Sequence, residues 1–259
     1  MNKIILKASA GTGKTHTMVN KIAKEIDDNH THKVIAAITF TIKAAQEIKD
    51  RLSVDVVQHF IGTNNSFVIE EVIKPFMKDV YGADFDLDMS TDYSAKVDTF
   101  QEAIEKIRNE GILCSYRDNK RNFIFDLAQE IVENSSACRL YLQAKYFKIY
   151  IDEYQDCDVN QHNLILTLSQ VLPTVIFGDP MQCIFDFAGR MPDWQNDVQS
   201  RFPSLGLLNT PWRWNNVGAP ELGEWVLAAR ETLLQGGNVD LLTCPAHVVW
   251  YQLTGVAYS

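Results

Sequence analysis

The sequence has few of the features that place a protein in a membrane or outside the cell. No apolar run approaches the roughly 18–20 residues that cross a bilayer, and the apolar run at residues 4–6 is too short for a signal peptide. The five cysteines lie far apart and form no CxxC pair, which argues against a zinc knuckle and a disulfide framework. We therefore expect a cytoplasmic protein.

An excess of positive charge is also missing. The 259 residues include 24 Lys or Arg and 33 Asp or Glu, giving a net charge of −9, whereas proteins that grip duplex DNA are usually basic. The balance is uneven, because residues 1–51 hold nine basic and five acidic side chains. An anion site is therefore expected near the N-terminus.

Short apolar runs alternate with helical periods along most of the chain. Runs that predict strands lie at residues 4–6, 34–38, 149–151, 175–177 and 205–208, and helices are expected at about 14–28, 43–52, 159–171 and 218–235. Because these runs are continuous in apolar residues, they are typical of parallel strands buried on both faces. The alternation predicts an α/β fold with a doubly wound parallel sheet.

One region interrupts the alternation. Residues 66–145 contain helical periods near 67–73, 100–107 and 123–132 but no clear strand. We interpret this region as a helical insert within the α/β domain. The predicted division is 1–66 and 146–235 for the two parts of the α/β domain, 67–145 for the insert, and 236–259 for a linker or the start of a further domain.

The strongest motif directly follows the first predicted strand and begins a helix, which is the setting of a phosphate-binding P-loop. Its residues are Ala8, Ser9, Ala10, Gly11, Thr12, Gly13, Lys14 and Thr15. The glycines let successive N–H groups point at phosphates, and the helix N-terminus adds positive potential. Lys14 would neutralise the β- and γ-phosphates, and the Thr15 hydroxyl would bind Mg²⁺. The motif predicts ATP and Mg²⁺ as cofactors.

Two further strands end in polar residues that suit phosphate chemistry. Asp152 and Glu153 follow the strand at 149–151, and Gln182 lies beyond the strand at 175–177. Asp152 would hold Mg²⁺ through water, and Glu153 would orient and deprotonate the attacking water. Gln182 would reach a γ-phosphate and report its loss. Taken alone, an acid pair is more often a solvated helix start; downstream of a P-loop the catalytic interpretation is favoured.

These segments, in this order, resemble the UvrD/Rep-type superfamily 1 helicases, whose RecA-like first domain carries A-x-A-G-x-G-K-T, DExQD and GDxxQ motifs. Residues 39–48 resemble the family motif TFTNKAAxEM, residues 62–67 resemble GTxHSF, and residues 208–213 resemble LxxNYRS. The resemblance implies that Arg213 touches the γ-phosphate and that Trp212 stacks on the base. His16 stands where the family often has Arg, beside the nucleotide.

The same resemblance implies binding of single-stranded DNA by residues of these motifs. The candidates are Phe40, Thr41, Thr63, Phe67 and Phe185. Aromatic rings stack on unpaired bases without sequence preference. The alternative is that the phenylalanines belong to the core; we favour the core for Phe67 and leave Phe185 open.

Residues 61–76 and 145–156 also resemble the helicase-like subunit of Gabija antiphage systems. That resemblance implies a protein partner, an OLD-type nuclease. The motifs of a second RecA-like domain do not occur in these 259 residues. Since such a domain supplies another arginine, we expect this chain to bind ATP and to hydrolyse it weakly by itself.

Three functions therefore compete. The first is the ATP-dependent motor part of a DNA helicase or translocase. The second is a regulatory NTPase subunit that senses DNA and nucleotide and controls a partner nuclease without unwinding. The third is a structural module that docks on a partner and turns over nothing.

Overall fold

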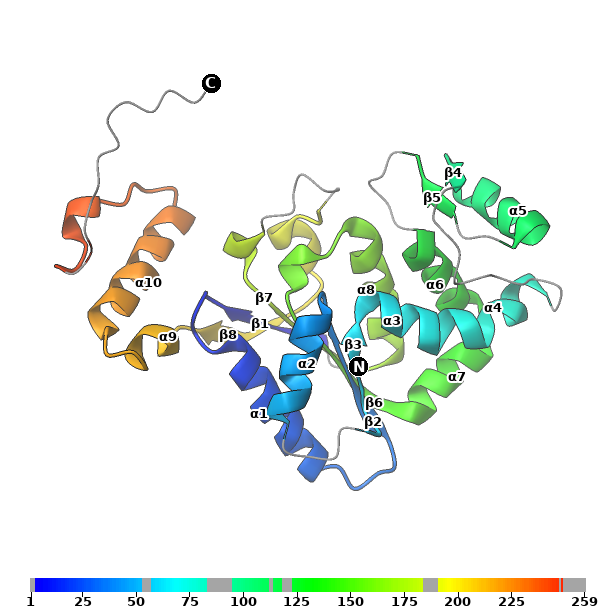
Figure 1. The fold of residues 1–259 in the computed structure, drawn as a ribbon, viewed down its shortest axis with the longest axis horizontal. Helices are drawn as coiled ribbons and strands as arrows, with labels where there is room; N and C mark the ends of the chain where they lie inside the picture. Colours follow the sequence, from blue (N-terminus) through cyan, green and yellow to red (C-terminus); the bar gives the residue numbers. More distant parts are fainter. Residues whose placement is uncertain are drawn as a thin grey trace.

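A six-stranded parallel sheet forms the centre of the molecule (Figure 1). The computed structural model describes residues 3–52, 57–82, 95–111, 114–117, 123–183, 191–246 and 248. The strand order is β3-β2-β6-β7-β1-β8, and every pair is parallel. The strands are β1 (Lys3–Ala8), β2 (Val34–Thr39), β3 (Phe60–Thr63), β6 (Tyr146–Ile151), β7 (Thr174–Gly178) and β8 (Ser204–Leu208). The predicted parallel α/β fold is confirmed, and β3 is an additional strand.

Apolar side chains cover both faces of this sheet. Along β2, Ile35 and Ala37 pack into one core cluster with residues of α1 (Lys14–Asp27) and α2 (Ile42–Arg51). Ala36 and Ile38 point the other way, into a cluster that includes α8 (Val159–Val171). Because side chains alternate along a strand, one continuous apolar run supplies both cores.

The region predicted as a helical insert is mainly helical but also contains a small sheet. Its helical segments are α3 (Asn64–Phe67), the π-helical η1 (Val68–Ile73), α4 (Lys74–Tyr81), α5 (Phe100–Glu110), α6 (Phe123–Asn134) and α7 (Ser136–Lys145). β4 (Ala95–Val97) and β5 (Cys114–Tyr116) pair in parallel, so the prediction of no strand here was wrong. Strands of three residues are too short to show a period in the sequence.

The insert and the sheet share one core. Ala103, Ile107 and Phe125 of the insert belong to the same buried cluster as Ile5 and Ile149 of the central sheet. The division at residues 67 and 145 remains a prediction, since packing is continuous across it.

The β8 edge differs from the rest of the sheet. Leu205 and Leu207 are 54% and 53% exposed, so the prediction of burial on both faces was wrong for this strand. β8 lies at the edge and pairs only with β1 among the described strands. Beyond it lie α9 (Trp212–Asn215) and α10 (Pro220–Leu234), to the side of the sheet (Figure 1).

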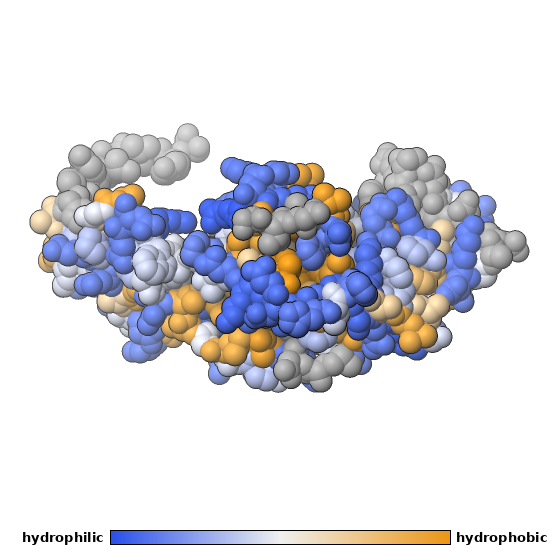
Figure 2. Space-filling model, turned by 90° about the horizontal axis from the view of Figure 1, so that it is seen from below, coloured by the Kyte–Doolittle hydropathy of each residue, from blue (hydrophilic) through white to orange (hydrophobic). Residues whose placement is uncertain are grey.

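Short helical segments connect the remaining elements: η2 (Tyr154–Asp156), η3 (Pro180–Gln182), η4 (Trp194–Gln199) and η5 (Leu241–Thr243). The surface seen from below is largely hydrophilic, with separate apolar patches between polar residues (Figure 2). Within the described ranges, every helix is too short or too polar to cross a bilayer.

Candidate functional site

The loop between β1 and α1 adopts a tight glycine-dependent curve. Gly11 and Gly13 have φ angles of +71° and +81°, a left-handed conformation that side chains disfavour. The Thr12 hydroxyl donates to the Ser9 carbonyl over 2.7 Å, which closes the turn. Ala8 and Thr12 are buried, whereas Lys14 and Thr15 face a cleft. The predicted loop therefore has the backbone shape that suits a phosphate chain.

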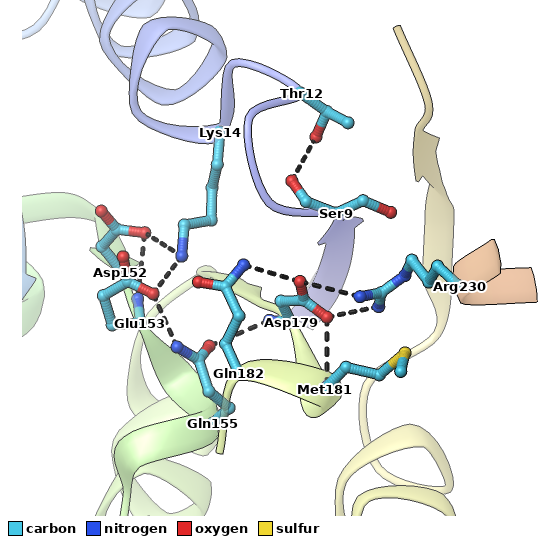
Figure 3. A network of polar contacts seen from close by, with 10 residues as sticks. All are labelled: Ser9, Thr12, Lys14, Asp152, Glu153, Gln155, Asp179, Met181, Gln182 and Arg230. Atoms are coloured by element: carbon cyan, nitrogen blue, oxygen red, sulfur yellow. Dashed lines mark hydrogen bonds and ion pairs between the residues drawn. The ribbon is translucent and has the colours of Figure 1, made fainter. Parts of the chain in front are cut away.

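The parallel sheet brings the predicted acids to this loop. Asp152 and Glu153 directly follow β6, whose carboxyl end lies at the same sheet edge as that of β1. Lys14 Nζ contacts Glu153 Oε2 and lies 3.7 Å from Asp152 Oδ1. The lysine of the loop and both acids, 138 or more residues away in sequence, thus form one cluster (Figure 3).

The two acids occupy different environments. Asp152 is 3% exposed, and burial raises its pKa to about 6, although Lys14 opposes this effect. Glu153 is half-buried and has a φ of +50°, the only positive φ of a non-glycine residue in the described ranges. Such a backbone costs on the order of 1–3 kcal/mol and is typical of functional sites.

A chain of hydrogen bonds connects Glu153 to the loop after β7 (Figure 3). Gln155 Nε2 donates to Glu153 Oε2 over 2.7 Å, and Gln155 Oε1 accepts from the Asp179 N–H over 2.9 Å. Gln182 Nε2 donates to Asp179 Oδ2 over 2.7 Å. Gln155 and Asp179 were not among the predicted site residues, although both belong to the recognised motifs.

The segment around α9 packs directly onto the loop. The Arg213 N–H donates to the Gly11 carbonyl over 3.0 Å. A Cβ on Gly13 would lie 3.1 Å from Trp212 Cδ1, and one on Gly11 would lie 2.7 Å from Trp214 Cζ3. These glycines therefore admit close approach of two tryptophans as well as an unusual backbone.

A single cleft of about 880 Å³ joins these groups. Its lining includes Lys14, Glu153, Gln182 and Arg213, which are the four predicted catalytic residues. The remaining lining residues are Ser9, Ala10, Gly11, Gly13, Thr15, His16, Thr17, Glu47, Arg51, Trp212 and Asn216. The volume lies within the range of small-molecule sites.

Four lining residues were missed by the sequence analysis: Thr17, Glu47, Arg51 and Asn216. Arg51 and Glu47 lie one turn apart on α2 and form an ion pair with Nη2 and Oε1 2.6 Å apart. Asn216 directly follows α9. The spacing of four between Glu47 and Arg51 predicts a helical ion pair, but nothing in the sequence places that pair at the cleft.

The predicted DNA-binding residues have different surroundings. Thr41 is exposed and accepts the Ala44 N–H over 3.1 Å as the N-cap of α2, and Phe40 is partly buried against the core. Thr63 caps α3. Phe67 is 1% exposed, so its ring cannot meet a base here, and the core alternative describes its position. Phe185 lies outside the described residues.

Comparison with known proteins identifies the family. The AAA domain family matches residues 1–188. The Gabija protein GajB of Bacillus cereus is 42% identical over 193 residues, covering 73% of this chain and 39% of that protein. The ATP-dependent DNA helicase Rep of Escherichia coli is 25% identical over 272 residues, covering 83% of this chain and 39% of that protein.

A probable DNA helicase II homolog of Rickettsia conorii is 26% identical over 242 residues, covering 72% of this chain and 36% of that protein. The chain thus spans less than two fifths of the length of each of these three relatives. The matched region contains the loop after β1 and the acids after β6. The chain therefore belongs to the AAA domain family and carries a superfamily 1 helicase domain of the UvrD/Rep type.

Proposed function

We propose that this chain is the nucleotide-binding part of an ATP-dependent helicase-like motor that acts on single-stranded DNA. The observation that carries the proposal is the cleft, which gathers Lys14, Glu153, Gln182 and Arg213 from four separate segments of the chain. A lysine, a carboxylate and two side chains that can donate to phosphate form the set that phosphoryl transfer to water requires.

The residues fit a nucleoside triphosphate with Mg²⁺. The loop backbone and Lys14 would hold the phosphates, and Thr15 and Asp152 offer the oxygen ligands that Mg²⁺ prefers. Bound Mg²⁺ would neutralise charge on the phosphate oxygens. Since Lys14 now contacts Glu153, a bound phosphate would compete for this lysine and release the carboxylate.

The other cleft residues have complementary roles in this proposal. Glu153 would accept a proton from the attacking water. Gln182 and Arg213 would contact the terminal phosphate, Trp212 would stack on the base, and His16 would lie beside the nucleotide. Trp212 is 52% exposed, which leaves much of its ring free for stacking.

The DNA surface would lie beyond the ends of β2 and β3. Thr39 and Thr63 are register partners, so the segments after these two strands are adjacent at the sheet edge. Phe40, Thr41 and Thr63 lie there, and Phe185 remains a candidate from sequence. Contacts to the DNA backbone would make binding weaken as salt increases.

The first test is ATP hydrolysis by the purified chain, with and without single-stranded DNA. We expect nucleotide binding with low turnover, because an arginine from a second RecA-like domain is missing from these residues. Lys14→Ala is expected to weaken binding, and Glu153→Gln to retain binding while lowering turnover by about 10²–10⁴-fold. Absence of nucleotide binding by the folded wild-type chain would contradict the proposal.

A second function is favoured by one comparison. Identity to GajB is 42%, against 25% to Rep of Escherichia coli, which supports a Gabija-like regulatory NTPase with an OLD-type nuclease as partner. A tailed duplex separates the two functions. Unwinding by the chain joined to a second RecA-like domain would support the motor, whereas altered cleavage by the nuclease without unwinding would support the regulator.

A further inference from the structure

Arg230 reaches from α10 to the loop that follows β7 and pairs there with Asp179 (Figure 3). Its Nη1 donates to Asp179 Oδ2 over 3.1 Å, and its Nη2 contacts Oδ1. Asp179 is fully buried, and the Arg230 side chain is only 15% exposed. Two parallel contacts to one carboxylate require the planar fork of a guanidinium, which lysine lacks.

The Asp179 carboxylate also orients the cleft residue Gln182. Its Oδ2 accepts from Gln182 Nε2 over 2.7 Å, and its Oδ1 accepts from the Met181 N–H over 3.1 Å. Because a carboxylate only accepts, the Gln182 amide must turn its NH₂ group toward Asp179. Gln182 Oε1 and the second N–H remain for contacts in the cleft.

Asp179 is also connected to the proposed catalytic acid. The Asp179 N–H donates to Gln155 Oε1, and Gln155 Nε2 donates to Glu153 Oε2. An added Cβ on Gly178 would lie 2.7 Å from the Trp194 ring and 3.2 Å from Gln155 Oε1. Close packing at Gly178 therefore leaves the Gln155 side chain little room to move. A series of direct contacts runs from Arg230 through Asp179 and Gln155 to Glu153.

We propose that Arg230 is a positioning residue that fixes the Gln182 amide and thereby couples α10 to the terminal phosphate of a bound nucleoside triphosphate. This inference rests on the proposed function. Loss of the guanidinium would leave a buried carboxylate unbalanced, which favours rearrangement of the loop after β7. A nucleoside diphosphate lacks the phosphate that Gln182 would contact, so the effect is confined to triphosphates.

The coupling is reciprocal. A triphosphate that binds the Gln182 amide in the orientation set by Asp179 stabilises the contact between Gln182 and Asp179, and Arg230 then holds α10 more firmly. The ion pair between Arg230 and Asp179 joins residues 51 positions apart. Within the described residues, it links α10 to the rest of the fold. α10 is thus placed to transmit nucleotide state.

The test compares affinities of the 259-residue chain for ADP and for the non-hydrolysable triphosphate AMPPNP by calorimetry. Arg230→Gln is expected to weaken AMPPNP binding about tenfold, the equivalent of one lost hydrogen bond, while ADP affinity changes less than twofold. Gln182→Ala should give the same selective loss, and the double variant should lose no more than either single variant. Arg230→Lys should lie between, because it restores charge without the fork.

Arg108→Gln, an exposed arginine of α5, is the matched control and should leave both affinities unchanged. If Arg230→Gln fails to fold, Arg230→Gln combined with Asp179→Asn removes both buried charges, and the same selective loss is expected. Equal weakening of ADP and AMPPNP, or additive losses in the double variant, would reduce Arg230 to a purely structural residue and overturn the inference.

The same data distinguish this inference from the proposed function. Wild-type chain that binds neither nucleotide would defeat both. Wild-type chain that binds both nucleotides, with an unchanged affinity ratio in the folded Arg230 variants, would defeat the inference alone.

Discussion

At the scale of single residues, a glycine can be required for two separate reasons: a left-handed backbone and the close approach of a neighbouring side chain. Gly11 and Gly218 have nearly the same left-handed backbone, with φ of +71° and +74°. A Cβ at Gly11 would lie 2.7 Å from Trp214 Cζ3, whereas nothing lies within 4 Å of one at Gly218. The two positions therefore form a matched pair.

We expect Gly218→Ala to lower the free energy of unfolding by about 1–2 kcal/mol, the cost of the left-handed backbone alone. Gly11→Ala should lower it further and weaken ADP binding, because Trp214 must move away from the loop. Urea denaturation and ADP titration measure the two effects. Equal losses of stability with unchanged ADP affinity would contradict this account.

His162 gives the chain a stability that depends on pH. It is buried, and its ring nitrogen lies 2.8 Å from the Tyr154 hydroxyl. Burial lowers its pKa, an effect that nearby Asp197 opposes and Arg201 reinforces. As the pH falls below about 6.5, the unfolded chain takes up this proton before the native chain does, so stability decreases.

Comparison with His162→Gln isolates this effect. Asp152 and Asp156, whose pKa values burial raises to about 6, act in the opposite direction, but they are present in both proteins. Between pH 7.5 and pH 5.5, the wild-type midpoint of urea denaturation should therefore fall relative to that of His162→Gln. Parallel curves for the two proteins would contradict the prediction.

At the scale of elements, the helix after the acid motif has an independent start signal. Asp158 Oδ1 accepts the Gln161 N–H over 2.8 Å, and Gln161 Oε1 accepts the Asp158 N–H over 3.0 Å, which forms a capping box at α8. This box satisfies backbone groups at the start of α8. We expect it to stabilise the folded chain without changing its affinity for nucleotide.

We expect Asp158→Ala to lower the free energy of unfolding by about 1 kcal/mol. Asp158→Ser keeps an N-cap oxygen and serves as the matched control, with stability near that of the wild type. ADP affinity should be unchanged in both variants. A loss of affinity in Asp158→Ala alone would show that the cap also shapes the cleft.

At the scale of the whole molecule, the shared core predicts one cooperative unfolding transition. The five tryptophans all lie outside residues 67–145, so tryptophan fluorescence reports on the chain outside the insert and circular dichroism reports on the whole. Phe125 is 1% exposed in the core of the insert. Its substitution therefore tests whether the insert and the sheet unfold together.

Phe125→Ala is expected to cost about 3–5 kcal/mol and to shift the fluorescence and dichroism transitions equally. Leu140→Ala, at a position 65% exposed on α7, should leave both transitions nearly in place. Separate transitions by the two probes would show that the insert unfolds as an independent unit.

The sequence by itself determined five of the six central strands, the helices that follow them and the glycine-rich loop after β1. These features depend on local patterns: continuous β-branched runs, a glycine-rich turn before a helix, and acids directly after a strand. It did not determine β3, β4 and β5, which are too short to show a period, or the exposure of β8, which depends on its place at the sheet edge.

Only the tertiary structure decided which side chains meet at the cleft. Arg51 and Glu47 line it because α2 packs beside α1, and Arg230 reaches Asp179 across 51 positions of sequence. No local pattern encodes such encounters, since they follow from how the parallel sheet aligns the carboxyl ends of distant strands and from the position of α10 beyond β8 (Figure 1). The sequence thus specifies the chemical groups, and the fold specifies their partners.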